Sequence, residues 1–383
     1  AYWDSEIKRA EIIGMADYPV YTTKPATDLS YLVCAQKIVD AHPYLYGQFA
    51  THNAHTLVAV KTMAERAGIV VEFQRLHGMG EVLYAAASES QGIAMPRTYA
   101  PVGQHKDLLP YLVRRLLENG ANTGFVHLLL ADSSDPSSVA ADPIGLVETG
   151  GARHLRIPLP INLYGDRRNS MGLNFSEALP RKLFASSLDV ISRQQNLALP
   201  IVRGKSEAEL QVTAVRNPYD ASNVLGRTAE ASHRQIDVAF EVAGAAQRLW
   251  DGKGGEERAG VLRGIADKLE SNILRLAALC VLEAGKVWAD AIAEVREAVD
   301  FCRYYALLAE REFGRGRVLA GPTGETNMLE LHGRGVFVCI SPWNFPLAIF
   351  VGQVTAALAA GNAVLAKPAE QTNLIAAEAV RLM

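Results

Sequence analysis

The chain has 383 residues and a formal net charge of −3, and 49% of its residues are apolar while 21% are charged. This composition is typical of a globular protein with enough apolar residues for the cores of about two or three domains. A nearly neutral chain gives no electrostatic reason to expect nucleic-acid contact from this segment.

The cysteines and the two ends of the chain indicate the cellular compartment and whether the chain is a fragment. The cysteines form no CxxC pair, which disfavours a clustered zinc site and favours a reducing compartment; they are Cys34, Cys280, Cys302 and Cys339. No leader-like segment opens the chain, and prolines and asparagines interrupt its longest uncharged stretch, so we expect neither a signal peptide nor a membrane span. We expect a cytoplasmic protein. Because the first residue is not methionine and the last falls inside an apolar-periodic segment, we expect an internal fragment of a longer polypeptide.

Residues 1–130 alternate short apolar runs with segments of helical spacing. Helices are predicted over Ser30–Val39 and Ala54–Ala67, and buried strands over Tyr46–Thr51, Ile69–Leu76 and Arg97–Pro101. This alternation is the βα repeat of a parallel sheet or barrel, and periodicity alone leaves both open.

A further helix is predicted directly after Asp107, which can cap it, with Pro110 in its first turn and Gly120 as its stop. Arg114 and Arg115 lie about 100° apart at the edge of its apolar stripe. Two guanidinium groups there can bind a carboxylate through paired hydrogen bonds. The alternative, which these residues alone favour, is a solvated basic edge paired with glutamates.

Residues 131–214 are rich in turn formers and are predicted to be a connector. Amphipathic helices whose stripes are explained by packing on a core are predicted beyond it, over Ile236–Trp250, Arg258–Glu283 and Ala289–Glu312. One βαβ unit follows, with strands over Val336–Ile340 and Ala363–Ala366 and a helix over Phe345–Ala360. The unit has no GxGxxG sequence, so a standard Rossmann phosphate loop is not expected.

Several motifs resemble those of a known family. Tyr99-Ala-Pro-Val-Gly and Tyr111-Leu-Val-Arg-Arg-Leu-Leu-Glu-Asn-Gly resemble the end of the FAD-dependent proline dehydrogenase barrel in the bifunctional proline utilization A family. Ser341-Pro-Trp-Asn-Phe-Pro and Lys367-Pro-Ala-Glu-Gln-Thr resemble aldehyde dehydrogenases. The resemblance implies an α/β fold. Residues 1–130 would be the C-terminal part of a proline dehydrogenase (βα)8 barrel, and residues 215–383 the N-terminal part of an aldehyde dehydrogenase NAD-binding domain.

The resemblance implies an FAD and proline site in the first part of the chain. His52 and Asn53 follow a predicted strand and could contact phosphate or ribose oxygens, although a cap for the next helix explains them equally well. The residues implied to contact FAD are Trp3, Thr22, Lys24, His52, Asn53, Glu118 and Phe125. Arg114 and Arg115 would bind the carboxylate of proline. Leu76 and Tyr99 would pack against the proline ring and keep it next to the flavin.

The resemblance implies a second site around the βαβ unit. The Asn344 amide could donate to the oxyanion of an aldehyde adduct, whereas its residue type and neighbours alone favour a turn asparagine. The residues implied to contact NAD are Ile340, Ser341, Pro342, Trp343, Lys367 and Glu370. Cys339 lies inside a predicted strand and is not expected to be the nucleophile, which the family places beyond Met383.

The implied function is oxidation of L-proline to 1-pyrroline-5-carboxylate with FAD, followed by NAD-dependent oxidation of glutamate semialdehyde to glutamate. The resemblance also implies a peripheral membrane or quinone acceptor for the flavin electrons, and a homo-oligomer for the intact protein. Two alternatives stay open. One is a fusion of the same folds that acts on another amino-acid-derived substrate, and the other is a degenerate chain that scaffolds or regulates a membrane-associated oxidase.

Overall fold

The computed structural model describes residues 3–119, 141–314 and 316–383. The chain divides into a smaller unit, residues 20–157, and a larger unit, residues 1–19 and 158–383. Among the described residues, no helix combines the length and the apolar character needed to span a bilayer.

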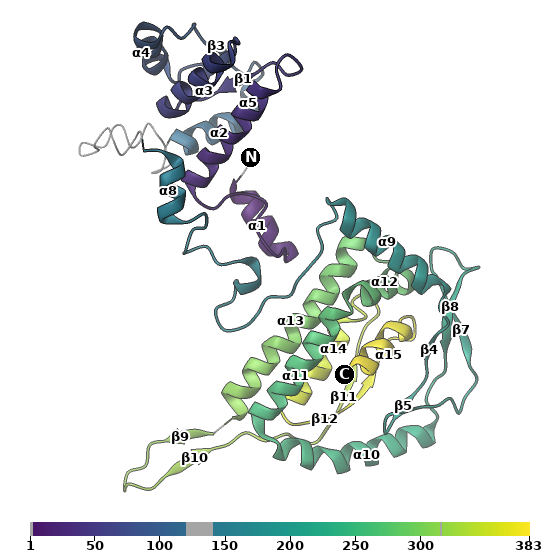
Figure 1. Ribbon diagram of the computed structural model, residues 1–383. Helices are drawn as coiled ribbons and strands as arrows, with labels where there is room; N and C mark the ends of the chain where they lie inside the picture. The colour runs from purple at the N-terminus through teal and green to yellow at the C-terminus, as the bar shows by residue number, and fades with distance from the viewer. Residues whose placement is uncertain (1–2, 120–140, 315) are drawn as a thin grey trace. The chain divides into compact units, whose positions relative to one another are not determined.

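A parallel sheet lies at the centre of the smaller unit (Figure 1). Its strands pair in chain order, and they are β1 (Gln48–Ala50), β2 (Glu72–Leu76) and β3 (Arg97–Tyr99). Two helices connect successive strands, and they are α3 (Ala54–Ala67) and α4 (Glu81–Gln91). The remaining described helices are α2 (Lys24–Asp40), α5 (His105–Asn119) and α8 (Pro143–Gly150). This order is the predicted βα repeat, and the predicted α/β fold class is confirmed.

The core of the smaller unit forms where the helices pack on the sheet. Its buried side chains are Ala35, Val39, Phe49, Leu57, Val60, Phe73, Tyr84, Ala87 and Ile93. Helix α3 has the predicted bounds because both of its ends carry strong local signals. The Asn53 side chain accepts the Thr56 N–H at its start, and Gly68 adopts the left-handed conformation, with a φ of 64°, at its end.

Two other helices of this unit begin earlier than the sequence pattern predicts. Helix α2 begins at Lys24 rather than Ser30, because Pro25 sits in its first turn, where no N–H is needed. Helix α5 begins at His105, so Asp107 lies within its first turn rather than at the cap, and Pro110 falls beyond that turn. The predicted capping role of Asp107 is therefore wrong.

The larger unit contains several small sheets. One pairs in the order β4–β8–β7, with β4 (Asn196–Ala198), β7 (Thr213–Arg216) and β8 (Val224–Thr228). Two short antiparallel pairs are β5 (Ile201–Val202) with β6 (Lys205–Ser206), and β9 (Arg317–Leu319) with β10 (Asn327–Leu329). The predicted βαβ unit is present, as β11 (Val336–Ile340), α14 (Ala348–Ala359) and β12 (Ala363–Lys367), with the two strands parallel.

Helices make up most of the larger unit, and α11 and α13 lie side by side along its length (Figure 1). The helices besides α14 are α1 (Trp3–Ile13), α9 (Ala178–Arg193), α10 (His233–Gly252), α11 (Gly254–Ser271), α12 (Ile273–Ala284), α13 (Trp288–Phe313) and α15 (Asn373–Leu382), with a short 3-10 helix at Pro160–Asn162. The helix predicted over residues 258–283 is divided at Asn272, whose side chain donates to the Lys268 carbonyl at 2.8 Å.

The region predicted as a connector contains regular structure of its own. Helices α8 and α9 and strands β4–β7 begin within residues 131–214. Phe184 and Ile191 of α9 are buried in the core of the larger unit, and Phe184 stacks edge-on against Trp288 with ring centroids 5.1 Å apart. Part of this region therefore belongs to the larger unit's core.

Side chains from other elements hold both ends of α14. At its start the backbone N–H groups of Leu347 and Ala348 donate to Glu294 Oε1, at 2.7 and 3.3 Å. At its end Trp250 Nε1 donates to the Leu358 carbonyl at 2.8 Å, and Arg258 Nε donates to the Ala359 carbonyl at 3.1 Å. These contacts satisfy backbone groups that the helix itself leaves unpaired.

A second buried carboxylate holds the start of α15. The N–H groups of Leu374 and Ile375 donate to the two oxygens of Glu283 on α12, at 2.7 and 2.9 Å. Burial raises the pKa of Glu283 to about 7, although these two hydrogen bonds act in the opposite direction.

Titration of Glu283 should make the unfolding free energy of the protein decrease as the pH rises. The pKa of this carboxyl is about 7 in the folded protein and 4.5 in its reference state, so between these values the folded state binds more protons. The unfolding free energy contributed by this group should therefore fall as the pH rises through that window, by on the order of 3 kcal/mol. Urea denaturation at several pH values should show this contribution as a slope that is steeper in the wild type than in Glu283→Gln. Exposed Glu241→Gln is the matched control, and an unchanged slope in Glu283→Gln would contradict the expectation.

Candidate functional site

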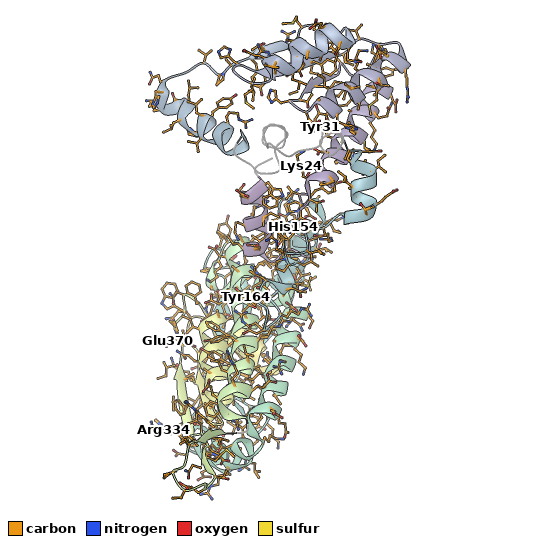
Figure 2. All side chains as sticks on the ribbon, turned by 90° about the vertical axis from the view of Figure 1, so that its left-hand side faces the viewer. Lys24, Tyr31, His154, Tyr164, Arg334 and Glu370 are labelled. Carbon is orange, nitrogen blue, oxygen red and sulfur yellow. The ribbon has the colours of Figure 1, made fainter. Side chains whose placement is uncertain are left out.

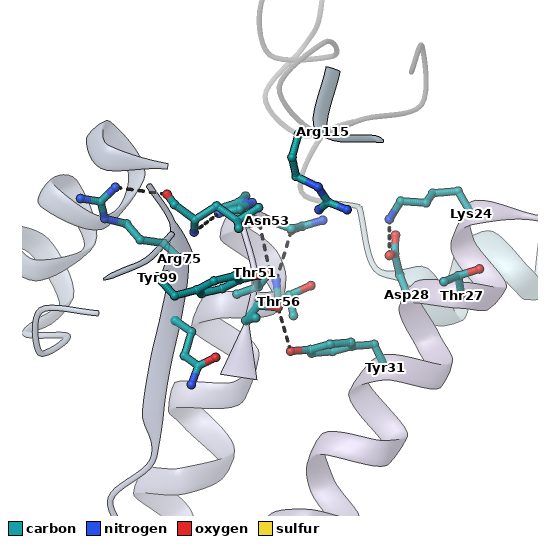
Figure 3. A pocket seen from close by; sticks show the side chains of 14 residues that line it. Lys24, Thr27, Asp28, Tyr31, Thr51, Asn53, Thr56, Arg75, Tyr99 and Arg115 are labelled. Carbon is teal, nitrogen blue, oxygen red and sulfur yellow. Dashed lines mark hydrogen bonds and ion pairs between the residues drawn. The ribbon is translucent and has the colours of Figure 1, made fainter. Parts of the chain in front are cut away.

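A cavity of about 330 Å³ lies at the carboxyl ends of β1, β2 and β3 (Figure 3). Ligands of α/β folds bind at this end of a parallel sheet. The lining residues are Lys24, Thr27, Asp28 and Tyr31 from α2, Ala50, Thr51, His52 and Asn53 from the end of β1, Thr56 from α3, Gln74, Arg75 and Leu76 from β2, Tyr99 from β3 and Arg115 from α5.

One face of α2 forms a wall of this cavity. Lys24, Thr27, Asp28 and Tyr31 follow helical spacing, so they share a face. The Lys24 ammonium pairs with the Asp28 carboxylate, which offsets much of its charge. The Tyr31 hydroxyl donates to the Ala50 carbonyl at 3.2 Å, and burial raises the pKa of this tyrosine.

The end of β1 supplies polar groups with fixed roles. His52 Nε2 accepts the N–H of Leu76 at 3.2 Å, so this nitrogen carries no proton and Nδ1 is the donor of the neutral ring. The Asn53 side chain caps α3 by accepting the Thr56 N–H at 3.2 Å. The helix-cap interpretation of Asn53 therefore holds, and its amide group still lines the cavity.

Tyr84 of α4 links the backbone just after β1 to the middle of β2. Its side chain is 1% exposed, and its hydroxyl lies 3.0 Å from the Thr51 carbonyl oxygen and 3.1 Å from the Gln74 carbonyl oxygen. Burial raises the pKa of Tyr84 to about 12, so the hydroxyl keeps its proton as a donor. The contact fixes the spacing of β1 and β2, whose carboxyl ends line the cavity.

The opposite wall combines an aromatic ring, an aliphatic side chain and a guanidinium group. Leu76 is buried, while Tyr99 is partly exposed. Arg115 extends into the cavity from α5, with Lys24 reaching in from α2 (Figure 3). The guanidinium carbon of Arg115 lies 5.4 Å from the ring centroid of Tyr111, which helps to orient it. A cation beside an apolar wall suits a small ligand that carries a carboxylate.

The structure gathers six of the predicted FAD and substrate residues in this cavity. They are Lys24, His52, Asn53, Leu76, Tyr99 and Arg115.

The other predicted residues of this site are placed differently or are not described. Thr22 does not line the cavity, and its hydroxyl accepts the His154 N–H at 3.0 Å. Trp3 lies in α1 of the larger unit. Arg114 and Glu118 belong to α5, but their side chains lie outside the described part of the chain, as does the whole of Phe125.

Sequence reasoning missed several lining residues. Thr27, Asp28 and Tyr31 follow Lys24 at helical spacing, and that spacing could have found them once the helix was extended to Lys24. Arg75, next to the predicted Leu76, was also missed. It lines the cavity while donating to the Met79 carbonyl at 3.2 Å and pairing with Glu81 at 3.3 Å.

The second group of predicted residues lies at the carboxyl ends of β11 and β12 in the larger unit. Asn344 is exposed, and its side chain has no hydrogen-bond partner among the described residues. Ser341 is buried, and its N–H donates to the Lys367 carbonyl at 3.1 Å, which joins the two strand ends. The Lys367 ammonium lies 3.5 Å from the exposed carboxylate of Glu370, which is labelled in Figure 2.

Three further predicted residues flank this strand end, and they are Ile340, Pro342 and Trp343. All three are exposed and therefore accessible to a ligand. Cys339 is 8% exposed, and burial raises the pKa of its thiol, so it lacks the thiolate character that a nucleophile needs. An apolar surface beside an amide donor and a Lys–Glu pair can bind a polar cofactor and polarise a carbonyl group.

Two families match separate parts of the chain. Residues 1–128 match the family described as proline dehydrogenase, and residues 205–383 match the aldehyde dehydrogenase family. The chain is 46% identical to the bifunctional protein PutA of Escherichia coli K12 over 398 residues, which cover 100% of this chain and 29% of that protein. The chain therefore spans less than a third of that curated relative.

Solved structures show the same correspondence. The crystal structure of proline utilization A from Bdellovibrio bacteriovorus, inactivated by N-propargylglycine, matches with a TM-score of 0.88 and 33% identity, over 100% of this chain and 39% of that chain. The 1-pyrroline-5-carboxylate dehydrogenase from Thermus with bound NAD matches with a TM-score of 0.54 and 31% identity, over 56% of this chain and 42% of that chain.

The Tyr84 hydroxyl should contribute measurably to the stability of the smaller unit. Tyr84→Phe removes a buried donor that the Thr51 and Gln74 carbonyls share, so the unfolding free energy should fall by about 1–2 kcal/mol. Urea denaturation of the variant and the wild type measures this difference. Tyr44→Phe, at a tyrosine that is 91% exposed, is the control and should change little. Equal unfolding free energies of Tyr84→Phe and the wild type would show that the hydroxyl contributes nothing to stability.

Proposed function

Because the chain joins a proline dehydrogenase segment to an aldehyde dehydrogenase segment in the order of the bifunctional PutA family, we propose that the intact protein carries out two successive oxidations. The first converts L-proline to 1-pyrroline-5-carboxylate with FAD. After hydrolytic ring opening, the second converts glutamate semialdehyde to glutamate with NAD. The observation that carries the proposal is the cavity at the ends of β1–β3, whose lining brings Arg115 together with Leu76 and Tyr99.

The cavity supports the binding of one part of FAD. Its volume of about 330 Å³ is at the low end for ligand sites, and FAD as a whole is larger. Lys24 can balance phosphate charge, and His52 and Asn53 can contact phosphate or ribose oxygens. Asp28 already pairs with Lys24, so a phosphate group at this position competes with that carboxylate. For Trp3, Thr22, Glu118 and Phe125, contact with FAD is proposed from the family resemblance alone.

In the proline step we assign the chain's residues to binding and orientation. Arg115, together with Arg114, binds the substrate carboxylate through charge-assisted hydrogen bonds, and Leu76 and Tyr99 hold the ring. Bound FAD supplies the two-electron acceptor, so these residues need no strong base among them. Holding the carboxylate at one end and the ring at the other leaves the substrate one productive orientation.

In the aldehyde step we assign Asn344 to the oxyanion. Its amide is exposed and has no hydrogen-bond partner within the described part of the chain, so it can donate a hydrogen bond to the oxygen of the aldehyde adduct. Lys367 and Glu370 would bind ribose hydroxyl groups of NAD, and the cofactor would lie along Ile340, Ser341, Pro342 and Trp343. Bound NAD supplies the hydride acceptor. The nucleophile is assigned to a part of the intact protein other than these residues, because Cys339 is buried.

We further propose the cellular setting that the family resemblance suggests. The cysteines Cys34, Cys280, Cys302 and Cys339 are free thiols, which supports a reducing, cytoplasmic compartment. A quinone at the inner face of the membrane would accept the flavin electrons, and the intact protein would be a homo-oligomer.

Replacing either arginine should impair proline oxidation specifically. Arg114→Met and Arg115→Met each remove a charge-assisted contact that is made to the substrate carboxylate, which should cost roughly 2–4 kcal/mol of transition-state binding. In kcat/KM this is a loss on the order of 30- to 1,000-fold, measured with a dye acceptor in the intact protein. Arg66→Met, at an exposed position of α3, is the control. Normal kcat/KM in both active-site variants would refute the carboxylate assignment.

Asn344→Ala separates a catalytic role from a turn-forming role. If the amide stabilises the oxyanion, kcat for semialdehyde oxidation should fall by about 100-fold or more while NAD binding survives. Steady-state kinetics and NAD titration of the intact protein measure both quantities, and the thermal midpoint shows whether the variant is folded. A folded variant with near-normal kcat would show that Asn344 only shapes the turn.

A further inference from the structure

A buried ion pair lies directly behind the loop that carries Asn344. Glu294 of α13 is 1% exposed, and Lys286, in the turn between α12 and α13, places its ammonium 2.7 Å from Glu294 Oε2. The other oxygen of Glu294 accepts the N–H groups of Leu347 and Ala348, at 2.7 and 3.3 Å. One carboxylate therefore joins a lysine on one side to the start of α14 on the other.

Lys286 also contacts the loop itself. Its ammonium lies 4.1 Å from the ring centroid of Phe345, within the range of a cation–π interaction. Phe345 immediately follows Asn344, and Leu347 follows two residues later. The pair thus contacts the loop twice, through the ring of the next residue and through the backbone at the helix start.

These contacts constrain Asn344, whose own side chain makes few contacts that would fix its position. The Asn344 side chain is exposed and has no hydrogen-bond partner among the described residues, so its position follows from its backbone. Pro346 has no N–H to anchor the loop. An oxyanion donor must lie within a few tenths of an ångström of its productive position, and a displacement of about 1 Å can lower a rate about 100-fold.

We propose that Lys286 and Glu294 are positioning residues for Asn344 in the aldehyde step, an inference that rests on the proposed function of Asn344. Lys286 holds Phe345 and balances the charge of Glu294, and Glu294 holds the start of α14. Together they fix the direction in which the Asn344 amide points. Neither touches the substrate, so their contribution passes through Asn344.

A double-mutant cycle in the intact protein tests whether Lys286 acts through Asn344. Lys286→Met should lower kcat for semialdehyde oxidation about 10- to 100-fold, with the Kd for NAD and the rate of proline oxidation unchanged. Lys286→Arg, which keeps the cation, should recover part of the loss. In the Asn344→Ala background, Lys286→Met should cause less than about a twofold further change, because the group that it positions is gone. Lys268→Met, at an exposed lysine of α11, is the matched control.

Lys286→Met leaves a buried carboxylate without its partner and can prevent folding. In that event the Lys286→Met/Glu294→Gln variant replaces it, since it removes both charges while a glutamine oxygen can still accept the Leu347 N–H. A folded variant with normal kcat would overturn the proposal, as would losses that multiply with that of Asn344→Ala. If Asn344→Ala alone leaves kcat unchanged, the oxyanion assignment fails. If Asn344→Ala lowers kcat and the Lys286 variants do not, only the positioning role fails.

Discussion

Two carboxylates that the fold removes from water determine how the larger unit presents its site. Glu283 and Glu294 lie on successive helices, and each accepts backbone N–H groups at the start of a different helix, α15 and α14 respectively. A buried carboxylate is tolerated only where donors replace the lost water, and a helix start offers unpaired donors with a favourable dipole. Since α14 follows the Asn344 loop and α15 follows the Lys367–Glu370 segment, both halves of the candidate NAD and aldehyde site are attached to these two side chains.

In the smaller unit, uncharged side chains hold the elements that line the cavity. The cavity forms where the strands end, and the Tyr84 hydroxyl holds β1 and β2 at a fixed spacing. His52 is held in one tautomer by the Leu76 N–H, which links the end of β1 to that of β2. Among the cationic lining residues, Lys24 and Arg115 come from helices and Arg75 comes from β2, so the positive charge around the cavity is supplied by three different elements.

The sequence predicts those parts of the molecule whose signals are local. The helix at Ala54–Ala67 has a cap and a stop beside it, and the strand at Val336–Ile340 is a continuous apolar run, so both were predicted with the observed bounds. The six residues that gather in the cavity were identified through motifs, whereas Tyr31 and Asp28 were missed because the start of α2 was placed too late. The strands β4–β8 contain two to five residues, too few for an alternating pattern to stand out. Glu294 could not be identified, because a glutamate on an amphipathic helix suggests a solvated surface and its hydrogen-bond partners lie more than 50 residues away.

The attachment of α14 at both ends has a consequence for how the larger unit comes apart. The helix is apolar along most of its length, with Phe350, Val351 and Val354 buried, and side chains of α13, α10 and α11 hydrogen-bond to backbone groups at its two ends. Fraying from either terminus would expose a carboxylate or a guanidinium group that has lost its partner inside an apolar core. The strand–helix–strand unit therefore behaves as a single cooperative block with the helices around it. We therefore expect the loop that carries Asn344 to move only when these neighbouring contacts are released together.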